Sequence, residues 1–499
     1  MEIPLTSIPS FRMIAQYGPK KPEVSSIAYN SRQVVKGCAF FCVPGENTDG
    51  HLYIGEAISN GASTIIGSNT VLLTEYAEKH PDLSFAAVEY VRVALAYMSD
   101  FFYRSPQKKL LKVGVTGTNG KTTTATYVYN LFNLLGISCG FIGTTGILGA
   151  KGKIPFQKST PTTPISSDIH KIFRKFVTED VRAVAMEVSS IALDQKRVEG
   201  IRFDVAIHTN ISEEHLEYHK TFGHYLQSKL LLFEQSNAAM VNIDDEGMAK
   251  EILEVIDYPH LTYSSQLDSG ADLIWTACES SDAGLDFELC YLGQRWPVHV
   301  PLYGEYNAAN LTAAIGAALL SGIGLEAILD VLPKMSQVEG RFQMIHGPGN
   351  RKIVLDYAHT PVALAAVLQE VKKLSHNRLI ALIAGIGIRD FSKMPKMAKA
   401  AEGKADVLVV TVDHPGHNEP AIVIDAVLEG FTIPYKQQVL TANSRREAVL
   451  AALEESGPDD LILLSSGSIN GAQIVRGEYI PHSDEAIIEE FFSSKNSEF

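Results

Sequence analysis

Apolar residues along this chain gather in short runs that alternate with amphipathic stretches, most regularly from residue 110 onward. Residues 113–116, 139–142 and 183–186 are largely apolar, as strands buried on both faces are. Residues 124–136 and 165–177 lie between these runs and carry apolar side chains at helical spacing. The alternation predicts parallel strands joined by helical crossovers, which form a doubly wound α/β sheet.

Similar elements are predicted on either side of this central segment. Before it, residues 38–43 and 63–67 have the pattern of strands and residues 53–59 that of a helix. After it, a β-hairpin is expected within 274–299, followed by helices at 307–321 and 325–333.

A third α/β unit begins near Gly340. Its predicted strands lie at 352–355, 379–384, 407–412 and 461–464, and its predicted helices at 361–374, 394–403 and 443–455. The stretch 103–106 is a candidate linker, because Pro106 disfavours helix in the residue before it. Since 499 residues are too many for a single core, we expect an α/β protein of three domains, bounded at 1–105, 106–338 and 339–499.

Composition excludes several classes of protein. The chain has 45% hydrophobic and 20% charged residues, as globular proteins do. Its net charge of -14 disfavours a nucleic-acid partner, because phosphates would be repelled. It has neither a long apolar run nor a basic N-terminus followed by an apolar core, so we expect a cytoplasmic protein with no membrane partner. Cys38 and Cys42 have a metal-like spacing, but their apolar surroundings favour buried small side chains.

A glycine-rich turn carries the strongest chemical signal. It follows the predicted strand at 113–116 and consists of Gly117, Thr118, Asn119, Gly120, Lys121, Thr122 and Thr123. Glycines let backbone N–H groups approach an anion, and the N-terminus of the next helix favours negative charge. Lys121 can reach the β- and γ-phosphates of a nucleotide, and Thr122 can hold Mg²⁺. The strict G-x-x-x-x-G-K-[ST] pattern needs a glycine at Val115, whereas the glycine is Gly114. The remaining features agree and favour a nucleoside-triphosphate site over an incidental loop.

Other polar residues follow at positions that suit such a site. Glu187 ends the apolar run at 183–186, where open α/β sheets present ligands, so it is either an Mg²⁺ ligand or a solvated strand end. His215 and His219 are four residues apart but lack the further ligands of a zinc site. They are either donors around a magnesium nucleotide or surface residues. Lys229 lies in an apolar helical stretch, where its sequence favours snorkelling to the surface over burial.

Taken together, these residues resemble the Mur ligase family. The resemblance is carried by residues 114–124, 186–190, 210–219, 229, 306–310, 340–342 and 356–361, in the family's order and spacing. Residues 30–32, 48–50, 162–164 and 195–198 extend it over essentially the whole chain. The chain is most similar to the branch that extends a UDP-N-acetylmuramoyl-dipeptide.

The resemblance implies a fold and a reaction. The fold has an N-terminal domain for a UDP-sugar, a central doubly wound P-loop-type ATPase domain and a C-terminal Rossmann-like domain for the incoming amino acid. In the reaction, which belongs to peptidoglycan precursor synthesis, a peptide carboxylate attacks the γ-phosphate of ATP and forms an acyl phosphate. The amino group of an amino acid then displaces phosphate. The implied cofactors are ATP and Mg²⁺, the partners are UDP-N-acetylmuramoyl-dipeptide and an amino acid, and the expected state is a monomer.

The resemblance also assigns roles to individual residues. Lys121, Glu187, His215 and Lys229 form the implied catalytic set, in which Lys229 is carbamylated and joins Thr122, Glu187 and His215 around magnesium. The implied ATP contacts beyond the glycine-rich turn are Asn307, Arg341 and Asp356. The implied contacts with the uridine-nucleotide peptide are Ser31, Thr162, Thr163, Ser190 and Arg197, and those with the amino acid are Arg389, Asp413 and His414.

The chain departs from the family pattern on the amino-acid side. Family members that add diaminopimelate carry Asp-Asn-Pro-Arg, whose arginine pairs with a second carboxylate, but here the motif ends in Gly416. Glycine makes no bidentate carboxylate contact, so diaminopimelate is disfavoured. The family's Ala-Gly-Lys-Gly-His-Glu is replaced by residues 465–470, Ser-Ser-Gly-Ser-Ile-Asn, which lacks the carboxylate expected to hold a far amino group.

Two other functions stay open on sequence grounds. The altered acceptor side is also compatible with a paralogue that ligates a different amino acid or carboxylate donor in a specialised pathway. A non-catalytic nucleotide-binding protein is disfavoured, because such a protein has no need to keep Lys121, Glu187, His215 and Lys229 together.

Overall fold

The computed structural model describes residues 1–499 apart from 46–47, 389–390, 433–437, 468–470 and 497–499. The chain forms two compact units. The first consists of Met1–Lys121, Gly136–Val241 and Asp245–His260, and the second of Thr122–Leu135, Asn242–Asp244 and Leu261–Phe499.

The first unit opens with a five-stranded sheet of order β1-β5-β4-β3-β2. Its strands are β1 (Met13–Tyr17), β2 (Ser26–Ala28), β3 (Cys38–Phe41), β4 (Ala62–Gly67) and β5 (Ser84–Val88), and only β1 runs antiparallel to its neighbour. Alternate residues of β3 face opposite cores. Phe41 packs with residues of α3 (Val91–Phe102), whereas Phe40 packs with residues of α1 (Ile54–Ser59) and α2 (Thr70–Lys79).

The first unit continues with a largely parallel sheet of order β12-β11-β6-β10-β7-β8-β9. Its strands are β6 (Leu111–Thr116), β7 (Cys139–Gly143), β8 (Gly146–Gly149), β9 (Gly152–Lys153), β10 (Ala183–Glu187), β11 (Val205–His208) and β12 (Ala239–Asn242), and its longer helices are α5 (Ser166–Thr178) and α8 (Phe222–Glu234). The central strand β6 pairs in parallel with β10 and β11. A Cβ on Gly114 would lie 2.8 Å from the ring of Phe203, so the close packing of β6 requires glycine there.

The second unit contains an antiparallel meander and a parallel sheet. The meander consists of β14 (Leu273–Ser281), β15 (Gly284–Tyr291) and β16 (Gln294–Val300), and α10 (Tyr306–Leu320) packs against β14. The glycine-rich turn leads into α4 (Lys121–Leu134), and α11 (Leu325–Val331) follows α10.

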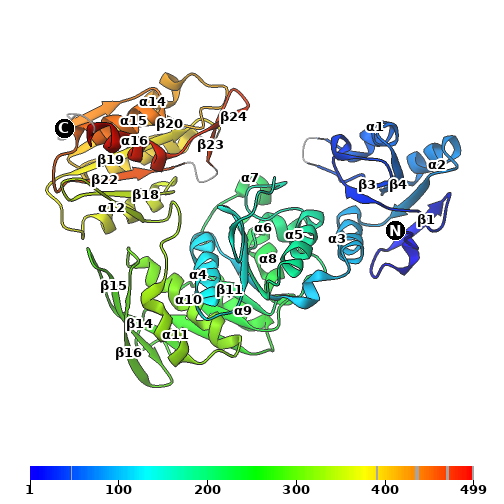
Figure 1. The fold of residues 1–499 in the computed structure, drawn as a ribbon, viewed down its shortest axis with the longest axis horizontal. Helices are drawn as coiled ribbons and strands as arrows, with labels where there is room; N and C mark the ends of the chain where they lie inside the picture. The colour runs from blue at the N-terminus through cyan, green and yellow to red at the C-terminus, as the bar shows by residue number, and fades with distance from the viewer. Residues whose placement is uncertain (46–47, 389–390, 433–437, 468–470, 497–499) are drawn as a thin grey trace. The chain divides into compact units, whose positions relative to one another are not determined.

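The parallel sheet of the second unit has the order β17-β18-β22-β19-β20-β21, and only β17 is antiparallel. The strands are β17 (Gln343–Gly347), β18 (Arg351–Asp356), β19 (Leu379–Ile386), β20 (Val407–Asp413), β21 (Gln438–Thr441) and β22 (Leu461–Ser465). One core contains residues of α12 (Pro361–Val371), α13 (Met394–Ala401) and α14 (Pro420–Leu428), and the other contains residues of α15 (Arg445–Glu455) and α16 (Asp484–Asn496). Helices therefore cover both faces of this sheet (Figure 1).

The predicted α/β fold is confirmed, including every strand predicted from residue 110 onward. Among the elements that the sequence analysis did not predict are the strands β11, β12, β17 and β21, the helices α14 and α16, and a polar hairpin formed by β23 (Ala472–Val475) and β24 (Glu478–Pro481). Cys38 and Cys42 are fully buried, as expected.

A buried ion pair joins α15 to the start of α16. Arg445 is fully buried, its guanidinium lies 2.6 Å from the carboxylate of Asp484, and it also donates to the carbonyl of Ser465. Burial of Asp484 raises the pKa of its carboxyl, but Arg445 and His482 outweigh this effect and hold the pKa below its ordinary value. Both charges therefore persist at neutral pH.

We expect Arg445→Met to lower the free energy of unfolding by about 3–5 kcal/mol, because it leaves Asp484 charged, buried and without its cation. Urea denaturation of the variant and the wild type measures the change. Arg446→Met is the matched control, because the Arg446–Glu490 pair is more than half exposed and such pairs contribute ~1 kcal/mol or less. Equal losses in the two variants would contradict the prediction.

Candidate active site

Thr209 and Asn210, which follow β11, contact the glycine-rich turn and fix its conformation. Gly117 and Gly120 have φ of +152° and +84°, and a Cβ on Gly117 would lie 1.8 Å from the hydroxyl of Thr209. The hydroxyl of Thr209 donates to the Asn119 carbonyl at 2.6 Å, and the Thr118 N–H donates to the Asn210 carbonyl at 2.8 Å. The turn is thus fixed in a glycine-dependent conformation suited to close approach of an anion.

Two lysine side chains converge on this turn. The ammonium of Lys121 donates to the carbonyls of Gly117 and Thr118, both at 2.8 Å. The ammonium of Lys229 donates to the same Gly117 carbonyl at 2.7 Å and lies 4.5 Å from the ring centroid of Tyr225. The ammonium of Lys121 beside a phosphate-type loop makes this place suitable for a polyanion.

Lys229 is only 1% exposed, so the expectation that it snorkels to the surface is wrong. Burial lowers the pKa of its ammonium well below the ordinary value, and the charge of Lys121 lowers it further. Glu214 and Asp245 act in the opposite direction. The amine of Lys229 therefore loses its proton more easily than the amine of a solvated lysine.

Glu187 ends β10, which pairs with β6 just before the glycine-rich turn. Its carboxylate accepts hydrogen bonds from the backbone N–H of Thr144 at 2.6 Å and from the Thr144 hydroxyl at 3.1 Å. Glu187 is 1% exposed, so it is a buried, oriented carboxylate and not a solvated strand end.

The two histidines do not act as a pair on one helix face. His215 precedes the single-turn helix α7 (Leu216–His219) with a φ of +56°, and its imidazole lies 3.4 Å from the carboxylate of Glu217. His219 is buried, and its ring lies 3.0 Å from the hydroxyl of Ser190. His215 is one-third exposed and near the Tyr225 ring, so it is the more accessible of the two.

The predicted donor-binding residues of the first unit lie around one loop. The Thr163 hydroxyl donates to the backbone carbonyl of Glu187 at 2.9 Å, and the Thr162 hydroxyl lies 3.3 Å from that of Thr144. Arg197 donates to the Thr163 carbonyl at 2.9 Å. This loop therefore approaches the end of β10 that carries Glu187.

Ser31 lies elsewhere in the first unit. Its hydroxyl donates to Glu56 at 2.9 Å, and it borders a hollow that Tyr53, Arg92 and Gln195 also line. Thr162, Thr163 and Arg197 thus lie near Glu187, whereas Ser31 lies at this hollow.

The predicted nucleotide contacts of the second unit are Thr122, Asn307, Arg341 and Asp356. Arg341 donates to the Thr122 hydroxyl at 3.3 Å and lies 4.8 Å from the Tyr357 ring centroid. Asp356 accepts from the Phe342 N–H at 2.8 Å, and Asn307 donates to the Tyr303 carbonyl at 2.7 Å.

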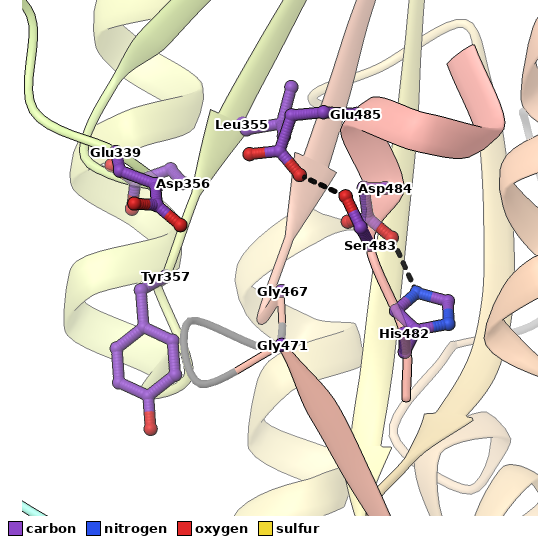
Figure 2. Close-up of a pocket in the computed structure, with 11 residues that line it drawn as sticks. Glu339, Leu355, Asp356, Tyr357, Gly467, Gly471, His482, Ser483, Asp484 and Glu485 are labelled. Atoms are coloured by element: carbon purple, nitrogen blue, oxygen red, sulfur yellow. Dashed lines mark hydrogen bonds and ion pairs between the residues drawn. The ribbon is translucent and has the colours of Figure 1, made fainter. Parts of the chain in front are cut away.

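Asp356 and Tyr357 also line a small pocket of the second unit (Figure 2). On the opposite side of this pocket, His482 contacts Asp484 at 2.8 Å. Gly467 and Gly471 lie between the two sides in this view.

The predicted acceptor residues at the end of β20 contact the hairpin that the sequence did not reveal. Asp413 accepts from Gln473 at 2.6 Å, and the His414 imidazole accepts from the Ile474 N–H at 3.0 Å. Gly416 forms a bridge with Val475 and has a φ of +63°. Arg389 lies outside the described residues.

Comparison with known proteins identifies the family. The chain matches the Mur ligase middle domain over residues 115–318, the Mur ligase glutamate ligase domain over 340–468 and the Mur ligase family catalytic domain over 23–103. It is 34% identical over 476 residues to UDP-N-acetylmuramoyl-L-alanyl-D-glutamate--2,6-diaminopimelate ligase 1 of Clostridium acetobutylicum, covering 95% of this chain and 96% of that protein. The chain belongs to the Mur ligase family.

Further comparisons agree with this Mur ligase assignment. The UDP-N-acetylmuramoyl-L-alanyl-D-glutamate--2,6-diaminopimelate ligase of Geobacillus kaustophilus is 33% identical to this chain, and the match covers 93% of this chain and 94% of that protein. A solved structure of a UDP-N-acetylmuramoyl-L-alanyl-D-glutamate--2,6-diaminopimelate ligase superposes with a TM-score of 0.68 at 27% identity, covering 99% of this chain and 100% of that one. The Mur ligase is thus a MurE homologue and an ATP-dependent acid–amino-acid ligase of cell-wall synthesis.

Mur ligases use ATP and Mg²⁺. Oxygen donors suit magnesium, and the first unit offers the buried carboxylate of Glu187. Among the described residues, no group of three or more His, Cys, Asp or Glu side chains is gathered around a metal-sized space. In proteins Mg²⁺ usually keeps several waters and binds through one or two carboxylates and substrate phosphates. No helix in the described part of this Mur ligase is long and apolar enough to cross a bilayer.

Sequence reasoning missed two residues that shape the site. The phenol of Tyr225 lies 2.9 Å from the Thr118 hydroxyl and its ring lies under Lys229. It precedes Lys229 by four residues, so helical spacing alone could have indicated it. Lys158 donates to three backbone carbonyls beside Glu187, and no sequence signal distinguishes it from other loop lysines.

Proposed function

We propose that this protein joins an amino acid to the side-chain carboxylate of the glutamate in UDP-N-acetylmuramoyl-L-alanyl-D-glutamate, through an acyl phosphate. The observation that carries the proposal is the convergence of two amines on the Gly117 carbonyl of the glycine-rich turn: Lys121, which supplies the cation, and Lys229, which is assigned to a carbamate below. A carboxylate that attacks a triphosphate is an anion that attacks an anion, so cations must neutralise the charge that develops. The attack forms a C–O–P bond and releases ADP. The amine then attacks the acyl carbon, phosphate leaves with the pair of electrons from the C–O bond, and the nitrogen releases a proton to solvent.

We assign the nucleotide to the glycine-rich turn. Backbone N–H groups of residues 117–123 and the ammonium of Lys121 would bind its phosphates. Asn307, Arg341 and Asp356 would contact the rest of ATP. The Arg341 guanidinium, which lies near Thr122 and Tyr357, supports this assignment because it offers a cation and a stacked plane.

We assign magnesium to Thr122, Glu187, His215 and a carbamate formed on Lys229. When bound, magnesium neutralises phosphate charge and orients the γ-phosphate. The low pKa of the Lys229 ammonium supports the carbamate, because the neutral amine is the form that reacts with CO₂. The carbamate replaces a buried cation with an anionic oxygen donor.

We assign the donor to Thr162, Thr163, Ser190 and Arg197, with Ser31 binding its nucleotide part. The contact between Thr163 and the backbone of Glu187 supports this assignment, because it brings the donor loop to the strand end where phosphoryl transfer would occur. Hydroxyls and a guanidinium are suitable partners for a peptide carboxylate.

We further propose that the acceptor lacks a second carboxylate. Both relatives described above are named for diaminopimelate, but here the motif ends in Gly416. A Cβ on Gly416 would lie 2.6 Å from a side-chain methyl of Ile388, and the φ of +63° also disfavours a residue with a side chain at this position. Asp413 and His414 remain as the described residues that would select the acceptor.

Diaminopimelate is expected to be a poor acceptor, and L-lysine or a smaller amino acid a better one. An unpaired carboxylate costs about 1–3 kcal/mol or more, which corresponds to roughly a tenfold preference or greater. Competition at equal concentrations of diaminopimelate, L-lysine, L-ornithine and L-alanine, with the products resolved by mass, measures it. A clear preference for diaminopimelate would overturn this acceptor assignment.

Phosphate release with ATP, Mg²⁺, the UDP-dipeptide donor and a panel of amino acids tests the proposed function as a whole. Release that needs both donor and amino acid supports it. If phosphate is released with a different carboxylate donor but not with this one, the chain is instead a paralogue of a specialised pathway. The absence of release with every donor would favour a nucleotide-binding protein without ligase activity.

A further inference from the structure

A lysine that the proposed mechanism does not use joins two parts of the first unit. Lys158 is half-buried, and its ammonium donates to the carbonyls of Gly143 at 2.5 Å, Thr144 at 3.1 Å and Pro161 at 2.5 Å. An ammonium has three N–H donors, so these three carbonyls match its capacity. Hydrogen bonds from a charged donor are among the stronger ones in proteins.

The three carbonyls belong to two segments with different partners. Gly143 ends β7, and Thr144 holds the Glu187 carboxylate through its N–H and hydroxyl. Pro161 directly precedes Thr162 and Thr163. One ammonium therefore bridges the turn that orients Glu187 and the loop assigned to the donor.

The ammonium of Lys158 is partly removed from water. Burial lowers the pKa of its ammonium to about 8, although the charge of Glu187 raises it and that of Lys153 lowers it. Arg197 supplies a second cationic anchor, donating to the Thr160 hydroxyl at 3.0 Å and the Thr163 carbonyl at 2.9 Å. Arg197 thus holds the loop at Thr160 and Thr163, and Lys158 ties it at Pro161 to the Gly143–Thr144 turn. The Thr162 and Thr144 hydroxyls, 3.3 Å apart, add a neutral contact between the same two segments.

We propose that Lys158 is a positioning residue for the donor: its ammonium fixes the loop 160–163 against the Gly143–Thr144 turn, so that the donor carboxylate meets the Glu187 end of β10. This inference rests on the proposed function of the same site. All three N–H groups of the Lys158 ammonium donate to backbone carbonyls. Lys158 therefore acts through the loop and not by contact with the reacting atoms. Its loss should therefore weaken donor use selectively.

The test compares Lys158→Met with the wild type in steady-state assays that vary the donor, ATP and the amino acid separately. We expect the KM for the donor to rise roughly tenfold or more, since charged hydrogen bonds are lost. The KM for ATP and for the amino acid should stay within about twofold. Lys158→Arg should recover much of the loss, because a guanidinium also donates to several carbonyls. Lys151→Met, at an exposed position of the same segment, is the matched control and should behave as the wild type.

Each outcome of this test separates the two claims. If the wild type does not use the donor, the proposed function fails. If the wild type is active but the donor KM is unchanged in Lys158→Met, the positioning role alone fails. A uniform loss of kcat in Lys158→Met, with no recovery in Lys158→Arg, would also overturn it. Should Lys158→Met not fold, Lys158→Gln keeps a neutral donor of two N–H groups and gives the same readout, with thermal denaturation recorded beside it.

Discussion

Lys121→Ala is expected to abolish ligation while leaving the fold intact. The ammonium of Lys121 lies over the glycine-rich turn and would contact the β- and γ-phosphates, where negative charge grows in the transition state. Loss of one such contact should remove about 2–4 kcal/mol of transition-state stabilisation, which lowers the rate roughly 30- to 1,000-fold. The turn itself should persist, because Thr209 and Asn210 hold it independently of Lys121.

Phosphate release at saturating substrates, with thermal denaturation beside it, measures this effect. Lys109→Ala is the control, because Lys109 is exposed in the segment just before β6. Near-normal turnover of Lys121→Ala would contradict the assignment of the turn to nucleotide phosphates.

Lys229→Ala is expected to be nearly inactive and to regain part of its activity when formate or acetate is added. The buried amine at this position would carry a carbamate, and a small carboxylate can occupy the cavity and replace the missing oxygen ligand. Lys250→Ala is the matched control, because Lys250 is 80% exposed and neither its loss nor added acetate should change the rate.

Carbon-13 NMR of the wild type in labelled bicarbonate adds a direct readout, since a carbamate on Lys229 gives a signal that Lys229→Ala lacks. A fully active alanine variant, together with no labelled carbamate in the active wild type, would refute the role of Lys229.

Much of the fold follows from local sequence, because the parallel strands are buried on both faces. The apolar runs that became β6, β10, β19, β20 and β22 need no long-range information to be found. The hairpin β23–β24 could not be found in this way. It is partly to fully exposed along both strands, so it has no clear alternation of apolar and polar residues.

The candidate site was predictable only in part, for a related reason. The glycine-rich turn is a local motif and lies where expected. The buried amine of Lys229 contacts Gly117, which is 112 residues away in sequence. A local pattern does not reveal such a contact, and the sequence-based choice of an exposed lysine was wrong. The contacts of Asp413 and His414 with Gln473 and Ile474 span 60 residues and likewise leave no mark in a local pattern.

Transfer of oxygen from donor to phosphate tests the central claim most directly. The UDP-dipeptide would be prepared with ¹⁸O in both oxygens of its glutamate side-chain carboxylate and incubated with the protein, ATP, Mg²⁺ and the preferred amino acid. An acyl-phosphate mechanism predicts that each released phosphate carries one ¹⁸O, because the carboxylate oxygen that attacks the γ-phosphate leaves with it. Product formed with unlabelled phosphate would contradict the account.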